Sequence, residues 1–160
     1  MPCIWGTHSR SQIFLDVAIV DAAAVANVTM GPPSAPVMQN PPLFKALLDT
    51  GAQTTMISPN VANTLGLTPI GQIPIQGVGP AVTYHNAYLF HVAFVIPLLH
   101  MGQPIAAGGG VGTMIFIHPP PIHGGEITST GGQFDVLLGM DVISTGSLAV
   151  EGIGTFSFSF

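Results

Sequence analysis

The residues with the clearest chemical potential are Asp49, Thr50 and Gly51, an acid followed by a small hydroxyl and a glycine. Two apolar residues before them, Leu47 and Leu48, indicate a strand that enters a hydrophobic core and then turns. Gly51 permits the tight turn that a Cβ would hinder. The turn should therefore hold an acid at the rim of an apolar interior. Because the chain has only seven Asp plus Glu, an acid in that position suggests a functional carboxylate.

The composition limits what such a site can serve. Charged residues make up 6% of the 160 residues, against about 25% in ordinary globular proteins. Lys45 and Arg10 are the two basic residues, and the formal net charge is −5. Since binding to phosphates needs clustered Lys and Arg, we expect no nucleic-acid partner. A charge-poor surface rich in Gly, Pro and apolar side chains favours self-association. The length of the chain fits a single domain.

The sequence shows no sign of a membrane anchor or a disulfide scaffold. Cys3 is the single cysteine and has no intrachain partner. Residues 1–10 lack the charged-then-apolar pattern of a signal peptide. The longest apolar run, residues 87–99, is interrupted by His91 and Pro97 and is too short to span a bilayer. These features leave the compartment undetermined, with a cytoplasmic location as the simplest expectation.

Short segments of β-branched and aromatic residues, separated by Gly and Pro, predict an all-β barrel or sandwich. Ser58 followed by Pro59 predicts the start of one short helix, with Gly66 as its stop, and residues 142–144 fit a second helical turn. The strands we expect cover residues 12–20, 43–48, 54–57, 72–76, 81–96, 113–118, 134–138, 147–150 and 154–160.

The remaining segments define the expected domain organisation. Residues 1–11 are expected to be an N-terminal tail, and residues 12–160 a single domain. Residues 101–132 are rich in Gly and Pro and are interpreted as an insertion. Gly77 to Pro80 is typical of a hairpin tip, because glycine supplies the positive φ angles of a tight turn.

Each candidate also has a purely structural interpretation. Asp49 can be a turn carboxylate that bonds nearby amides, and residues 77–79 can be an ordinary hairpin turn. Asp141 is interpreted as structural, as a cap of the short helix. The glycine run at residues 108–112 has no following Lys and no βαβ context, so we interpret it as a loop and not as a phosphate cradle.

We expect neither a metal nor another cofactor. The histidines show no compact ligand motif with Cys or acidic residues. Those considered are His85, His91, His100, His118 and His123.

Three segments together resemble one family, the retropepsin-like aspartic peptidases. ALLDTGA at residues 46–52 resembles the family's active-site segment, and IQGVG at residues 75–79 resembles its flap tip. VLLGMD at residues 136–141 resembles its hydrophobic-hydrophobic-glycine segment. They occur in the family's order, and the similarity covers roughly residues 12–160. The resemblance implies a retropepsin-like half-barrel with one or two short helices.

The resemblance also implies an aspartic endopeptidase that is active as a homodimer on a peptide or protein substrate. Such peptidases use two carboxylates that share a proton. This chain has one Asp-Thr-Gly, so Asp49 would meet its mate across a two-fold axis, while Thr50 would hydrogen-bond across the dimer. The catalytic residues implied are Asp49, Thr50 and Gly51. The substrate-binding residues implied are Ala52, Gln53, Gly77, Val78, Gly79 and Leu138.

Two further hypotheses stay open at this point. One is a non-catalytic peptide-binding or assembly module on the same fold, which would bind peptides without cleaving them. The other is a monomer that contains only half of a site.

Overall fold

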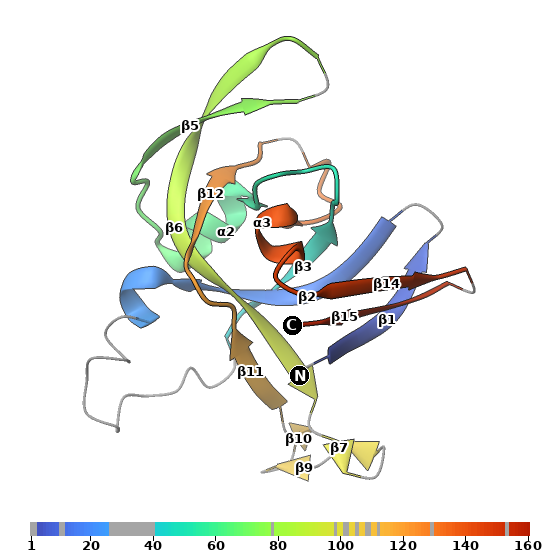
Figure 1. Ribbon diagram of the computed structural model, residues 1–160. Helices are drawn as coiled ribbons and strands as arrows, with labels where there is room; N and C mark the ends of the chain where they lie inside the picture. The colour runs from blue at the N-terminus through green and yellow to red at the C-terminus, as the bar shows by residue number, and fades with distance from the viewer. Residues whose placement is uncertain are drawn as a thin grey trace.

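The molecule consists of a body of strands with a hairpin rising from one end and short strand pairs at the other (Figure 1). The two chain ends lie close together, because Cys3 is paired with Ser159. The computed structural model describes residues 3–9, 12–25, 41–77, 79–97, 99–100, 103–104, 106–107, 110–111, 113–128, 130–152 and 154–160.

The described elements are almost all strands. The strands are β1 (Cys3–Ser9), β2 (Gln12–Asp21), β3 (Leu43–Leu48), β4 (Met56–Ile57), β5 (Gly71–Gln76), β6 (Val82–Pro97), β7 (Leu99–His100), β8 (Gln103–Pro104), β9 (Ala106–Ala107), β10 (Gly110–Val111), β11 (Thr113–Ile117), β12 (Ile122–Glu126), β13 (Val136–Leu138), β14 (Ser147–Glu151) and β15 (Thr155–Ser159). The helices are α2 (Pro59–Leu65) and α3 (Met140–Ile143), with one more helical turn at residues 22–25. Among the described residues, no helix has the length and apolar character needed to cross a membrane.

One large sheet forms the body. Its hydrogen-bonded order is β11-β6-β12-β4-β13-β3-β2-β1-β15-β14, and β5 pairs with β6 outside this path. β6 also pairs with β2, and this pairing closes part of the sheet into a ring. The ring consists of β6, β12, β4, β13, β3 and β2. β13 runs parallel to β3 and antiparallel to β4, so it lies between them. This strand-rich architecture confirms the predicted all-β class.

The core inside the ring is apolar and aromatic. Phe90, Phe94 and Phe158 are at most 1% exposed, and the Phe94 ring stacks on Phe160 with centroids 4.4 Å apart. Fully burying one such side chain stabilises a fold by about 1.5–3 kcal/mol relative to leaving it exposed. Because Phe158 and Phe160 come from the C-terminal end, the terminal strands contribute directly to the stability of the body.

The predicted helix boundaries at α2 are confirmed. The Ser58 hydroxyl accepts a hydrogen bond from Val61 N at 3.4 Å, and Pro59 occupies the first turn. Gly66 ends the helix with φ of 63°, a left-handed conformation that favours glycine. The Ser58 hydroxyl also donates to Asp135 Oδ1 at 3.1 Å, which ties the start of the helix to the residue before β13.

Two parts of the predicted domain organisation differ from the structure. Residues 1–11 were expected to be a tail, but Cys3–Ser9 form β1 and pair with β15 and β2. Residues 101–132 were expected to be an insertion, but β11 and β12 both pair with β6 inside the sheet. The main partner of β1 is β15, at the other end of the chain, and local composition does not indicate such a pairing. Residues 101–102, 105, 108–109, 112 and 129 lie outside the described part.

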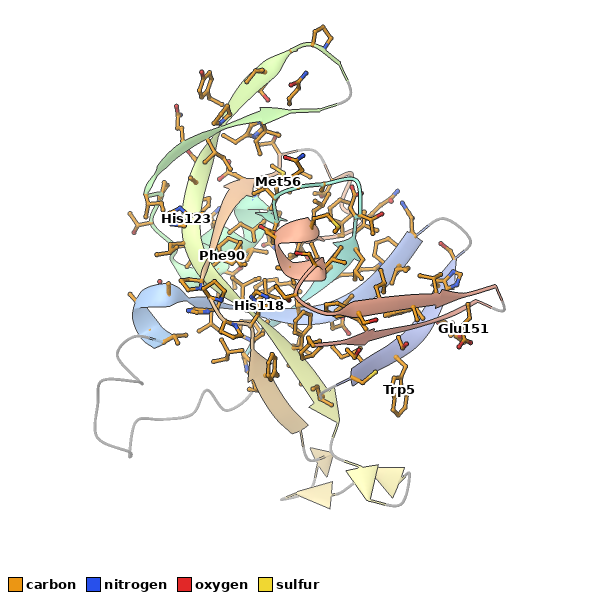
Figure 2. All side chains as sticks on the ribbon, viewed as in Figure 1. Trp5, Met56, Phe90, His118, His123 and Glu151 are labelled. Atoms are coloured by element: carbon orange, nitrogen blue, oxygen red, sulfur yellow. The ribbon has the colours of Figure 1, made fainter. Side chains whose placement is uncertain are left out.

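A buried imidazole connects the end of β11 to the segment after α3. His118 lies in the body of the molecule, away from the raised hairpin (Figure 2). Its side chain is 2% exposed, and its Nε2 lies 2.9 Å from Thr145 Oγ1. Thr145 Oγ1 donates to the Val142 carbonyl at 2.7 Å, so it accepts from a protonated Nε2. Nδ1 is then an acceptor, and it has no partner among the described residues. This arrangement suits the neutral imidazole.

We predict that this histidine makes the fold less stable in acid. Burial lowers the pKa of His118, and His91 adds to this effect while the Pro120 carbonyl and the Asp141 carboxylate oppose it. Below the ordinary pKa of 6.5 the unfolded chain therefore binds a proton that the folded chain resists, and the free energy of unfolding falls. His118→Gln should make this fall shallower in urea denaturation between about pH 7.5 and about pH 5. The exposed His123→Gln should keep the wild-type slope, and an unchanged slope in His118→Gln would contradict the prediction.

Candidate active site

The Asp49 turn begins where β3 leaves the core. β3 is hydrogen-bonded to β2 on one side and β13 on the other, so its end is fixed. Asp49 N donates to the Leu138 carbonyl at 3.0 Å, and Gly51 N donates to Asp49 Oδ1 at 2.8 Å. Asp49 is half-buried, whereas Thr50 and Gly51 are exposed. The structure thus holds one carboxylate at the rim of the core and leaves the tip of its turn open.

A groove of about 470 Å³ lies between this turn and the raised hairpin. Met56 lies below the hairpin and beside the turn (Figure 2). None of the lining residues carries a charge, so the groove suits an uncharged ligand. The lining residues are Gly51, Ala52, Gln53, Thr54, Met56, Ile73, Pro74, Ile75, Gln76 and Gly77.

Gly125 lies directly under the apolar part of the groove. A Cβ at this position would come within 2.9 Å of Ile73 Cδ1, 3.0 Å of Ile75 Cδ1 and 3.4 Å of Met56 Cε. Real Cβ atoms essentially never come within 3.0 Å of another heavy atom, so a side chain at this position would force its neighbours to move. The glycine therefore lets the ends of three apolar side chains settle toward β12, which leaves space above them.

The raised hairpin is formed by β5 and the first half of β6. Its last described pair is Gln76 with Val82, and the Gln76 side-chain amide donates to the Gly79 carbonyl at 2.9 Å. Gly79 has φ of 141°, which an L side chain rarely adopts. The predicted hairpin is therefore present, and Gly77 at its tip lines the groove. Val78 lies outside the described residues.

A second segment, Leu138 to Asp141, is interlocked with the Asp49 turn. Met140 N donates to the Ala52 carbonyl at 2.8 Å, and Asp141 N donates to the Gln53 carbonyl at 3.3 Å. The two backbones touch at Gly139, where a Cβ would lie only 2.6–2.9 Å from backbone atoms of Thr54. Glycine is required there because of this contact, and the turn and the segment behave as one unit.

The Asp141 side chain bonds the turn and does not cap its own helix. Its Oδ2 accepts from Thr55 N at 2.9 Å, and its Oδ1 accepts from Thr55 Oγ1 at 2.6 Å. The N-cap residue of α3 is Gly139, and no side chain caps that helix. The interpretation of Asp141 as a helix cap is therefore wrong. Its partner Thr55 lies 86 positions earlier in the chain.

The structure brings together most of the residues predicted for the site. Gly51, Ala52, Gln53 and Gly77 line one groove, and Asp49 and Thr50 begin the turn that forms its wall. A larger set was missed by the sequence reasoning. It comprises Thr54, Met56, Ile73, Pro74, Ile75 and Gln76 in the groove, with Thr55, Gly125 and Gly139 behind it. The alternation of Ile73 and Ile75 before the glycine turn is a signal that could have found part of this set, because it places both side chains on one face of the strand.

Leu138 occupies a different position from the one expected for a substrate contact. Its side chain is 1% exposed and belongs to the core. It reaches the site through its carbonyl, which accepts from Asp49 N. Within the described part of the chain, no three His, Cys, Asp or Glu residues gather in a way that would hold a metal ion.

We predict that Gly139→Ala severely perturbs the site, because the added methyl would meet the Thr54 backbone, which cannot rotate aside. Overpacking of this kind costs about 1–3 kcal/mol. Thermal and urea unfolding of the purified variant measure the loss. Gly152→Ala is the matched control, since nothing lies within 4 Å of its Cβ position, and it should leave stability within about 0.5 kcal/mol of wild type. Equal stabilities of the two variants would rule out the close contact.

Comparison with known proteins agrees with this geometry. A family model described as aspartyl protease matches residues 35–142, more than half of the chain. The chain is also similar to the crystal structure of a retropepsin-like aspartic protease from Rickettsia conorii. The identity is 14% and the TM-score 0.51, over 98% of this chain and 89% of that one, which establishes the fold. No curated protein sequence matches. The chain belongs to the aspartyl protease family, and its fold is retropepsin-like.

Proposed function

We propose that the chain is an aspartic endopeptidase that acts as a homodimer, with one Asp49 from each subunit. The observation that carries this proposal is the half-buried Asp49 carboxylate, fixed by Gly51 N at 2.8 Å, beside an uncharged groove. Membership of the aspartyl protease family supports peptide hydrolysis as the reaction. Peptides and proteins are therefore the substrate class.

In this mechanism the two Asp49 carboxyls share one proton, because like charges so close cannot both ionise. The ionised carboxylate takes a proton from a water molecule, whose oxygen attacks the carbonyl carbon of the scissile amide. The protonated carboxyl gives its proton to the carbonyl oxygen. The product is a tetrahedral gem-diol intermediate. When it collapses, the first carboxyl gives the proton it took up to the amide nitrogen, the C–N bond breaks, and one hydroxyl of the intermediate returns its proton to the other carboxylate. This yields a free acid and an amine and restores the pair with one shared proton. The pKa values that govern activity belong to the pair.

The dimer follows from the number of acids at the site. Asp49 provides one carboxylate, and Asp141, the acid on the adjoining segment, has both oxygens engaged by Thr55. A two-fold axis lets the same residue of two chains face itself. Thr50 is exposed at the tip of the turn, where a partner subunit can reach it.

The groove supports a preference for uncharged, apolar substrate side chains. Burying a charge without a partner is costly, and no lining residue can pair with one. Met56, Ile73 and Ile75 provide apolar contacts, while backbone groups of Gly51 to Gln53 and of Gly77 can bond an extended peptide. The β5–β6 hairpin would act as a flap that closes over the peptide.

We predict that Asp49→Asn lowers peptide cleavage by at least about 10²- to 10⁴-fold, because the acid and base of the reaction are lost. Cleavage of a diverse peptide library at several pH values measures the effect, and wild-type activity should be highest in acid. A hydroxyl-containing mimic of the tetrahedral intermediate should inhibit it.

Asp16→Asn is the matched control, since it makes the same change at an exposed position of β2 and should leave cleavage unchanged. Peptide cleavage by Asp49→Asn at the wild-type rate would contradict the proposal. Peptide binding by both wild type and Asp49→Asn, with no product from either, would instead support a non-catalytic binding module on this fold.

We further predict that Gly125→Ala changes the size preference of the groove. The new methyl would push the flexible ends of Ile73, Ile75 and Met56 toward the groove and shrink it. For paired peptides that differ only in one apolar residue, kcat/KM for the larger side chain should fall roughly 10- to 200-fold relative to the smaller one. Gly71→Ala, on the same hairpin but with nothing within 4 Å, should leave the ratio unchanged. An equal effect on both peptides contradicts the assignment of this groove.

A further inference from the structure

We propose that Asp141 is a positioning residue for the Asp49 turn, and that it acts through Thr55. The role rests on the proposed function, since it concerns the reaction in which Asp49 is the acid and base. Asp141 does not line the groove and would touch neither the substrate nor the reacting atoms. Its carboxylate instead holds the far end of the turn.

The direction of each hydrogen bond around Thr55 is fixed by chemistry. Gly139 N donates to Thr55 Oγ1 at 3.1 Å, so that oxygen is already an acceptor. Its own hydrogen therefore goes to Asp141 Oδ1, 2.6 Å away, and Thr55 N donates to Asp141 Oδ2 at 2.9 Å. The result is a relay of hydrogen bonds, in which the Gly139 amide donates to the Thr55 hydroxyl and the hydroxyl donates to the Asp141 carboxylate.

This relay needs an acceptor at both oxygens of residue 141. An ionised carboxylate accepts at both, whereas an amide has one oxygen and one NH₂ donor. With Asn at this position, one of the two Thr55 donors would face another donor. Thr55 is 0% exposed, so water cannot replace the missing acceptor, and an unpaired buried donor is costly.

The remaining links between the two segments are made by backbone groups. They run from Asp49 N to the Leu138 carbonyl, and from Met140 N and Asp141 N to the Ala52 and Gln53 carbonyls. The Thr55–Asp141 pair closes this set at the end of the turn opposite Asp49. Losing it leaves the turn attached but free to shift, and small displacements of a reacting group reduce rates strongly.

The test uses three variants of the full chain. Asp141→Asn keeps the size of the side chain and removes one acceptor, and Thr55→Val removes the hydroxyl from the relay. Thr55→Ser keeps the hydroxyl and is the conservative control. Each is titrated with a tight-binding transition-state mimic to count active sites, and kcat is then expressed per titrated site.

We expect kcat per titrated site to fall roughly 10- to 100-fold in Asp141→Asn and in Thr55→Val, and to stay within about twofold of wild type in Thr55→Ser. A role limited to global stability would lower the number of titrated sites and leave kcat per site unchanged. That outcome would overturn the proposal.

Amide hydrogen exchange provides a readout that does not depend on catalysis. In Asp141→Asn the Ala52 and Thr55 amides should exchange at least about tenfold faster, while the amides of β14 keep their wild-type rates. Unchanged exchange in the turn would refute the positioning role whether or not the protein cleaves peptides. Faster exchange in a protein whose wild type shows no cleavage would support this role and refute the proposed function.

Discussion

The close approach of Gly139 to Thr54 is the contact on which the site depends. It lets the segment from Leu138 to Asp141 lie against the turn after β3, with Met140 N bonded to the Ala52 carbonyl. Any side chain at Gly139 would separate the two backbones. Because β13 also lies between β3 and β4, the strand that leads to the turn and the segment that supports it share one rigid frame.

This frame explains how a chain with few charges can hold an acid in a defined place. The Asp49 carboxylate is bonded by Gly51 N inside its own turn, and the turn is bonded at its far end by Asp141. In the proposed reaction, the first acid takes part in the chemistry, and the second bonds Thr55 in support of the turn. Since one carboxylate cannot share a proton with itself, the proposed reaction requires a second copy of the chain.

Local signals in the sequence predicted local features well. Ser58 and Gly66 marked both ends of α2, and the order of the family-like segments led to the retropepsin-like fold. Features that depend on distant partners were not predictable from these signals. Trp5 lies on a strand because β1 pairs with β15, which is almost a chain length away. Asp141 looked like a helix cap because its partner Thr55 is 86 residues away.

The central claim is that each active site contains Asp49 from two subunits. The most direct measurement mixes wild-type chains with Asp49→Asn chains, allows subunits to exchange and follows cleavage against the wild-type fraction. If both carboxylates are required, activity falls with the square of that fraction, so an equal mixture keeps about a quarter of it. A linear decline, with about half of the activity in the equal mixture, would show that one chain is a complete site and contradict the account.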